Sequence, residues 1–215
     1  MKNRRESEQA HLQAERPDRQ PGNPVKEMFL LAALYLPLGF FLWFSFASAL
    51  MWLPARLLEM ILTGLFPEIF ERLVQLGFHF EVQTSIRMSR LVEGRVALMN
   101  LEANPMLYAW GMALLFGLTM ATPMPGRRRA LQLLAGYLVV VLVTVWGVFW
   151  QLWRDLAFST GQEGARVVAD SALAPTMIAL FYQLGYLMLP AVVPLAAWIL
   201  MNRPFLERVA FGHRD

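Results

Sequence analysis

Four long apolar runs, none of which contains Asp, Glu, Lys, Arg or His, constrain the fold of this chain more than any other feature. They cover residues 28–52, 106–122, 131–152 and 173–201. A helix needs about 20 apolar residues to cross the hydrocarbon core of a bilayer, and the run over 106–122 is at the short end of the range. With 57% hydrophobic and only 16% charged residues, the composition is more apolar than that of a soluble domain. The sequence therefore predicts an all-α membrane domain over 28–201 with four transmembrane helices.

Basic residues are concentrated in the segments outside these runs, which predicts the topology. They occur in the N-terminal tail (1–27), at Arg127–Arg129 and in the C-terminal tail (202–215). Four spans put these segments on one side, and the positive-inside rule assigns that side to the cytoplasm. We therefore expect a multi-pass protein of a bacterial inner membrane with both termini in the cytoplasm, and with 53–105 and the polar loop 154–171 facing outward. Because the positive charge is accounted for in this way, it does not indicate nucleic-acid binding.

The N-terminal region has two further features. Residues 1–27 are polar and interrupted by prolines, which predicts a disordered tail. Ala47-Ser48-Ala49 resembles a signal-peptidase site, but the apolar run before it is longer than the hydrophobic region of a signal peptide. We expect an uncleaved signal anchor.

The outer segment 53–105 is predicted to contain a pair of amphipathic helices and a small β-hairpin. Residues 53–65 place Arg56, Glu59 and Thr63 opposite leucines at helical spacing, and 68–76 repeats the pattern after Pro67. Such helices lie in the membrane interface. The charged positions are then most simply a solvated helix face: Arg56, Glu59, Glu68, Glu71 and Arg72. Residues 78–88 alternate between apolar and polar, Glu93-Gly94 forms a turn, and 95–101 returns as a second strand.

The polar junction Asn100-Leu101-Glu102-Ala103-Asn104-Pro105 connects this hairpin to the second apolar run. Pro105 suits the first turn of a helix, where its missing N–H is not needed. Asn104 is placed to cap the free N–H groups of that turn, and Glu102 lies near the positive end of the helix dipole. The junction is either a structural cap or a contact point for a partner.

Within the apolar runs, only a few polar and small residues suggest specific helix packing. Gln183 is the best candidate for a hydrogen bond between helices. Gly111, Gly117, Gly136 and Gly147 allow helices to approach closely. Pumps and ion-coupled transporters usually place ionisable groups inside their spans. Their absence disfavours transport, although a small transporter subunit remains an alternative.

The sequence offers little catalytic chemistry. It has no cysteine, and its three histidines are far apart, so neither a metal nor a cofactor site is predicted. His79 is expected on the exposed face of the first strand, because its neighbours alternate. A membrane-surface hydrolase using Glu102 and His79 remains an alternative.

The segment Leu101–Gly111, LEANPMLYAWG, resembles the junction into the second span of the exosortase H-associated membrane proteins. The similarity in layout extends over 28–201. It implies association with exosortases, the membrane proteases that process sorting-signal tails on exported proteins of Gram-negative bacteria. Exosortases carry a Cys, Arg and His catalytic set, so a chain without cysteine is not itself one. The resemblance transfers no catalytic residues.

Together these features predict a non-catalytic accessory protein of an exosortase-type sorting system. Its partners would be membrane lipid, an exosortase-type protease and the exported substrates of that protease. The residues expected to contact a partner or substrate lie on the hairpin and junction: Arg87, Arg95, Asn100, Glu102, Asn104, Pro105 and Tyr108.

Overall fold

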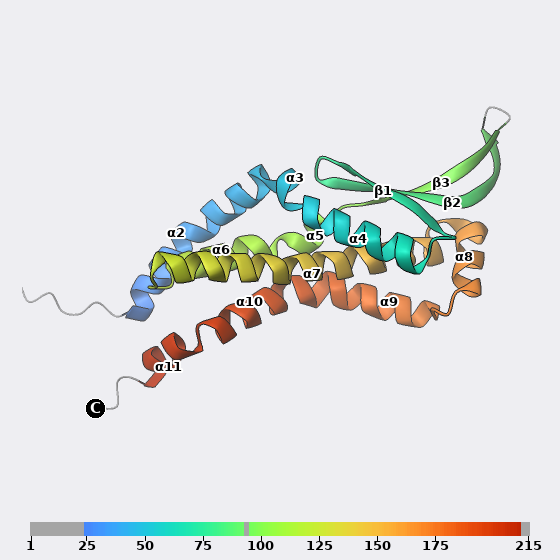
Figure 1. The fold of residues 1–215 in the computed structure, drawn as a ribbon. Helices are drawn as coiled ribbons and strands as arrows, with labels where there is room; N and C mark the ends of the chain where they lie inside the picture. Colours follow the sequence, from blue (N-terminus) through green and yellow to red (C-terminus); the bar gives the residue numbers. More distant parts are fainter. Residues whose placement is uncertain (1–23, 93–94, 212–215) are drawn as a thin grey trace, which may run out of the picture.

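The computed structural model describes residues 24–92 and 95–211 of the chain, in which a helical bundle carries a three-stranded sheet (Figure 1). Of the predicted N-terminal tail, 1–23 lies outside the described residues and 24–27 belongs to the first helix. The elements are, in chain order, α2 (Pro24–Ser45), α3 (Ala47–Leu50), α4 (Trp52–Leu65), β1 (Phe70–Leu76), β2 (His79–Val92), β3 (Arg95–Ala103), α5 (Met106–Ala109), α6 (Gly111–Ala121), α7 (Gly126–Phe158), α8 (Gly161–Asp170), α9 (Pro175–Gln183), the π-helix η1 (Leu184–Met188), α10 (Leu189–Met201) and α11 (Arg203–Phe211).

Helix α7 is the central element of the bundle. It contacts α4, α5, α6, α8, α9 and α10. Its β-branched residues supply much of the buried surface, with Val140, Val141, Val145 and Val148 all buried. The start of α2, the α6–α7 connection and α11 lie at one end of the molecule, whereas the sheet and α8 lie toward the other (Figure 1).

Four helical segments within the described residues are long and apolar enough to cross a membrane: Lys26–Ser45, Ala47–Leu65, Gly126–Phe158 and Pro175–Met201. Three of them correspond to predicted spans, whereas Ala47–Leu65 shares only residues 47–52 with the first one. The predicted second span is the shorter helix Met106–Ala121, and Ala47–Leu65 qualifies in its place by length and composition.

Two predicted boundaries in the helical part are wrong. The run over 28–52 is not one helix, because α2 ends at Ser45 and a new helix begins at Trp52, where Pro54 fits the first turn. The polar loop predicted over 154–171 is mostly helical, since α7 continues to Phe158 and α8 begins at Gly161, which adopts φ +73°.

The four glycines singled out in the sequence all lie at close helix contacts, as predicted. A Cβ on Gly111 would lie 2.4 Å from the Pro190 carbonyl oxygen, and one on Gly136 would lie 2.4 Å from the Leu115 side chain. Gly117 contacts Leu36 of α2, and Gly147 faces the ring of Tyr108. In a membrane, where the hydrophobic effect does not drive helices together, such close contacts support association by van der Waals packing.

Residues 70–103 form a three-stranded antiparallel sheet, not a two-stranded hairpin. The second amphipathic helix predicted over 68–76 is wrong, because these residues form β1 and pair with β2 from Phe70↔Thr84 to Leu76↔His79. Gly77 adopts φ +64° between the strands, a conformation that favours glycine in a two-residue hairpin turn. The first amphipathic helix is present as α4, with Leu58 and Leu62 buried.

The alternation predicted for the hairpin holds from Phe80 to Ile86 and gives the sheet one buried face, whereas Phe78 and Met88, predicted to lie on the same face, are exposed. Phe80, Val82, Thr84 and Ile86 are buried on β2, with Met99 and Leu101 buried beside them on β3. The hydroxyl of Thr84 donates to the Met99 carbonyl oxygen, so the polar group inside this face is satisfied. The sheet packs through this core on α4, α7 and α8.

A buried amide pair joins the ends of α7 and α10. Gln132 Nε2 donates to Asn202 Oδ1, and Asn202 Nδ2 donates to Gln132 Oε1, both at 3.1 Å. Gln183, the residue predicted to make such a bond, is exposed, and no hydrogen bond joins its side chain to a described residue. That prediction is wrong because Gln183 lies on the outer surface of α9.

We expect Gln132→Ala to lower the free energy of unfolding by about 1 kcal/mol, as is typical for hydrogen bonds between membrane helices. Asn202→Ala should cost a similar amount, and the double variant should cost less than the two together. Gln183→Ala is the matched control and should leave stability unchanged. Unfolding in SDS titrations, followed by circular dichroism, measures all four variants, and additive losses would contradict the pairing.

Candidate functional site

The junction between β3 and α5 begins with a helix cap. Asn104 Oδ1 accepts a hydrogen bond from the backbone N–H of Met106 at 3.0 Å, and Pro105 is buried in the first turn. The capping geometry predicted for these two residues is therefore present. Because Asn104 and Pro105 act within the first turn of α5, this half of the junction is better described as a structural cap than as a contact point for a partner.

Tyr108, a predicted contact residue, lies inside the bundle. It is fully buried, and its hydroxyl donates to Gln151 Oε1 at 3.1 Å. Its ring packs against Gly147 and lies edge-on to Tyr186. Because no part of this side chain reaches the surface, it joins helices α5, α7 and η1 and offers no contact to a partner in this structure.

Asn100 and Glu102 form the exposed half of the junction and lie on the outer face of β3. Across the sheet, Glu81 pairs with Glu102 and Gln83 pairs with Asn100. Asn100 Nδ2 donates to Glu81 Oε1 at 2.7 Å. We call the set Glu81, Gln83, Asn100 and Glu102 the polar sheet face. Two neighbouring carboxylates give it a negative charge that would complement a basic segment.

The two predicted arginine contacts lie further along the same sheet. Arg87 is exposed and its backbone pairs with Leu98. Arg95 begins β3 and its backbone pairs with Val92, but its side chain lies outside the described part of the chain. Arg87 is therefore available at the surface, on the part of β2 that extends beyond the pairing with β1.

His79 and Glu102 do not form a catalytic pair in this structure. His79 is exposed, as predicted, and its ring packs on Phe78 with 4.4 Å between the centroids. No hydrogen bond joins the two side chains in the described ranges, whereas a base and the group it activates lie within hydrogen-bond reach. Across those same ranges, no group of three His, Asp or Glu side chains could hold a metal ion.

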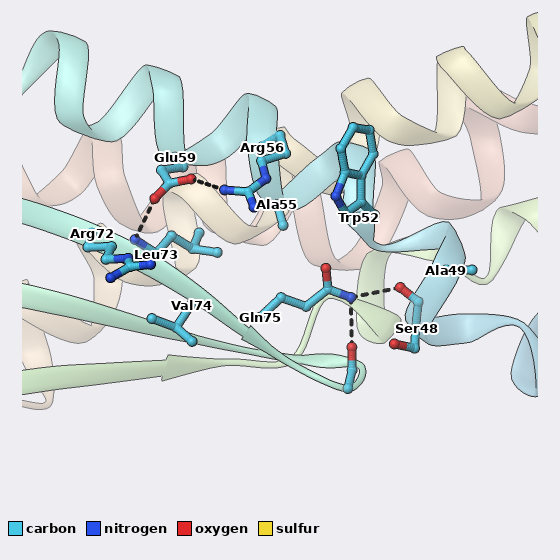
Figure 2. Close-up of a pocket in the computed structure, with 11 residues that line it drawn as sticks. Ser48, Ala49, Trp52, Ala55, Arg56, Glu59, Arg72, Leu73, Val74 and Gln75 are labelled. Carbon is cyan, nitrogen blue, oxygen red and sulfur yellow. Dashed lines mark hydrogen bonds and ion pairs between the residues drawn. The ribbon is translucent and has the colours of Figure 1, made fainter.

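A cleft of about 640 Å³ separates α3 and α4 from β1 (Figure 2). Arg56 and Glu59 on α4 form an ion pair at 2.9 Å, and Glu59 Oε1 accepts from the Leu73 backbone N–H at 3.4 Å. On the strand side, Gln75 Nε2 donates to the carbonyl oxygens of Ser48 at 2.7 Å and Gly77 at 2.8 Å. We call this space, lined also by Trp52 and Arg72, the α4–β1 cleft.

Sequence reasoning missed this cleft for a specific reason. Arg56, Glu59 and Arg72 were assigned to a solvated helix face, which placed Arg72 on a second surface helix. Its actual position on β1 brings it to the wall opposite α4. A short apolar segment fits helix or strand equally well by periodicity, so the segment 68–76 alone contained no decisive signal.

Comparison with known proteins gives one match. Residues 22–205 match the family model described as exosortase H-associated membrane protein. No curated protein and no solved structure matches the chain. The matched range includes the sheet and the helices from α2 to α10. It also includes the segment Leu101–Gly111, on which the resemblance was noted. The chain therefore belongs to the family of exosortase H-associated membrane proteins.

Proposed function

We propose that this chain is a non-catalytic accessory protein of an exosortase-type sorting system, and that its polar sheet face docks the protease or the exported tail of a substrate. The observation that carries the proposal is the polar sheet face itself, in which Asn100 and Glu102 are exposed and Glu81 and Gln83 are half-buried, held on the bundle by a buried apolar face. The family description links such proteins to an exosortase.

The arrangement of the chain supports an outward orientation for the sheet. Arg127–Arg129 begin α7 at the end where α2 starts and α11 lies, far from the sheet (Figure 1). With those arginines in the cytoplasm of an inner membrane, by the positive-inside rule, the sheet faces the periplasm. Exported substrates would meet it there.

Edge addition is the docking mode that we propose for an exported tail. In the strand order β1-β2-β3, β3 is an edge strand, and it carries Asn100 and Glu102. An extended peptide can add a strand to such an edge through backbone hydrogen bonds, while side chains on the face provide specificity. Glu102 and Glu81 would favour a basic peptide.

The experiment that tests the accessory role is crosslinking of the tagged chain in membranes, gentle detergent purification and mass spectrometry of the proteins recovered. A membrane protease of the exosortase type, crosslinked to β2 or β3, is the expected result. Recovery of the chain alone, or only with itself, would contradict the proposal.

Glu102→Ala should lower the processing of sorted substrates while leaving the amount of the protein in the membrane unchanged, because Glu102 is exposed. The matched control is Glu71→Ala, which removes an equally exposed carboxylate from β1. Substrate processing and membrane levels are both read by immunoblot. Equal loss of processing in the two variants would remove the special role of the polar sheet face.

Asn104→Ala distinguishes the cap from the docking face. Loss of its hydrogen bond to Met106 should lower stability by about 1 kcal/mol, and processing should fall only in proportion to the protein level. A loss of processing at full protein level would instead make Asn104 a contact residue.

A further inference from the structure

The α4–β1 cleft has a charge excess that the structure does not satisfy. It contains two arginines and one glutamate among its lining residues, so one positive charge remains after Arg56 pairs with Glu59. Arg72 is exposed and forms no ion pair with any described residue. The guanidinium of Arg56 is also accessible, with 61% of its side chain exposed. A ligand with a compact negative charge would complement these groups.

Exposed apolar side chains lie on the cleft or close in sequence to residues that line it. Trp52 lines it and is 58% exposed. Phe44 lies near the end of α2, Phe46 lies between α2 and α3, and Leu76 and Phe78 lie on either side of Gly77; all four are exposed. The rings of Phe44 and Phe78 lie 6.5 Å apart, so the turn leans on the end of α2. Tryptophan is enriched at the level of the lipid headgroups in membrane proteins.

We propose that the α4–β1 cleft binds the headgroup of an anionic membrane phospholipid, with its phosphate between Arg56 and Arg72 and its acyl chains along α2. The occupant follows from the two features together. The excess of positive charge favours binding of an anion. The exposed apolar side chains on and beside the cleft favour an anion that carries hydrocarbon chains. Arginine suits this role because its planar fork binds phosphate oxygens in pairs.

This binding would also hold the sheet against the helices. Gln75 already connects β1 to the carbonyl oxygen of Ser48, and Glu59 connects α4 to the backbone of Leu73. A headgroup between Arg56 and Arg72 would add a third connection between the two walls. The proposal rests on the membrane environment and the cleft, and does not depend on the docking role of the polar sheet face.

Native mass spectrometry of the full chain in detergent, titrated with phosphatidylglycerol or with phosphatidylcholine of the same acyl chains, tests the proposal. We expect tighter binding of phosphatidylglycerol. Arg72→Gln should weaken it roughly three- to tenfold, as expected for loss of one charged contact at a partly exposed site. Arg166→Gln is the matched control, because it removes an exposed arginine from α8, outside the cleft, and should leave binding unchanged.

Glu59→Gln provides a change in the opposite direction. It frees Arg56 from its ion pair while retaining a carbonyl oxygen for the Leu73 N–H, so binding of phosphatidylglycerol should become tighter. Equal binding of the two lipids, or equal binding by Arg72→Gln and Arg166→Gln, would overturn the proposal. Glycerol 3-phosphate binding as tightly as the lipid would make the cleft a site for free anions and would overturn the assignment to lipid. Loss of a crosslinked protein from Arg72→Gln, with lipid binding unchanged, would assign the cleft to a protein partner instead.

Discussion

Trp153→Ala is expected to lower the free energy of unfolding by about 3–5 kcal/mol, the range for truncation of a fully buried large aromatic residue. Trp153 is completely buried on α7 and lies edge-on to Phe66 and Phe70, with ring centroids 4.8 and 6.0 Å away. These rings connect the bundle to the first strand of the sheet. A cavity there would loosen the sheet from α7 as well as lower stability, because the surrounding side chains relax only partly.

Two controls make this prediction specific. Trp153 Nε1 has no hydrogen-bond partner among the described residues, so Trp153→Phe should cost far less than truncation to alanine. Phe158→Ala removes an exposed ring from the same helix and should change stability little. Denaturant unfolding followed by circular dichroism, and protease cleavage within the β2–β3 segment, measure the effect. Similar stabilities for Trp153→Ala and Phe158→Ala would show that the sheet is held by other contacts.

Gly147→Ala is expected to destabilise the protein by about 1–3 kcal/mol, the usual cost of overpacking. The added Cβ would lie 2.1 Å from Cδ1 of the Tyr108 ring. That ring cannot move aside easily, because it is fully buried and its hydroxyl is bound to Gln151. Helices α5 and α7 would have to separate, and the hydrogen bond would lengthen.

Gly64→Ala is the matched control for this substitution. Gly64 also lies in a helix, but no atom lies within 4 Å of its added Cβ. The change should stabilise α4 by about 0.5–1 kcal/mol, since alanine is the better helix former. The same substitution is therefore expected to lower the free energy of unfolding at Gly147 and to raise it at Gly64. In a Tyr108→Ala background, Gly147→Ala should lose most of its cost, and a cost that persisted would contradict the clash with the ring.

The contacts at the junction bear on whether its residues form a structural cap or a contact point for a partner. The sequence placed Asn100, Glu102, Asn104, Pro105 and Tyr108 together as one polar and aromatic junction. The fold separates them into an exposed pair on the sheet, a helix cap and a buried tyrosine. Only the exposed pair can meet a partner directly. Among the described residues, a hydrogen bond joins Asn100 to Glu81 and none joins His79 to Glu102.

The sequence determined the features that depend on neighbouring residues alone. Apolar runs free of charge predicted three of the four helical segments long enough to cross a membrane, but not Ala47–Leu65. Alternation predicted the strands β2 and β3, and Asn104 followed by Pro105 predicted the start of α5. Each of these is a local pattern, since hydrophobic periodicity and capping operate within a few residues of the chain. The sequence predicted that helices approach closely at Gly111, Gly117, Gly136 and Gly147, but not which residues they contact there.

Only the tertiary structure decided which distant segments meet. Residues 68–76 suit a helix or a strand, and pairing with β2 made them β1. Gln132 and Asn202 lie 70 positions apart, so nothing near either residue indicated their hydrogen bonds, whereas Gln183, the obvious choice in its own segment, is exposed. The α4–β1 cleft has the same origin, because Arg72 lines it together with Arg56 only after β1 forms. Local patterns set the type and the buried face of an element, but contacts between elements depend on long-range packing that no short window of sequence contains.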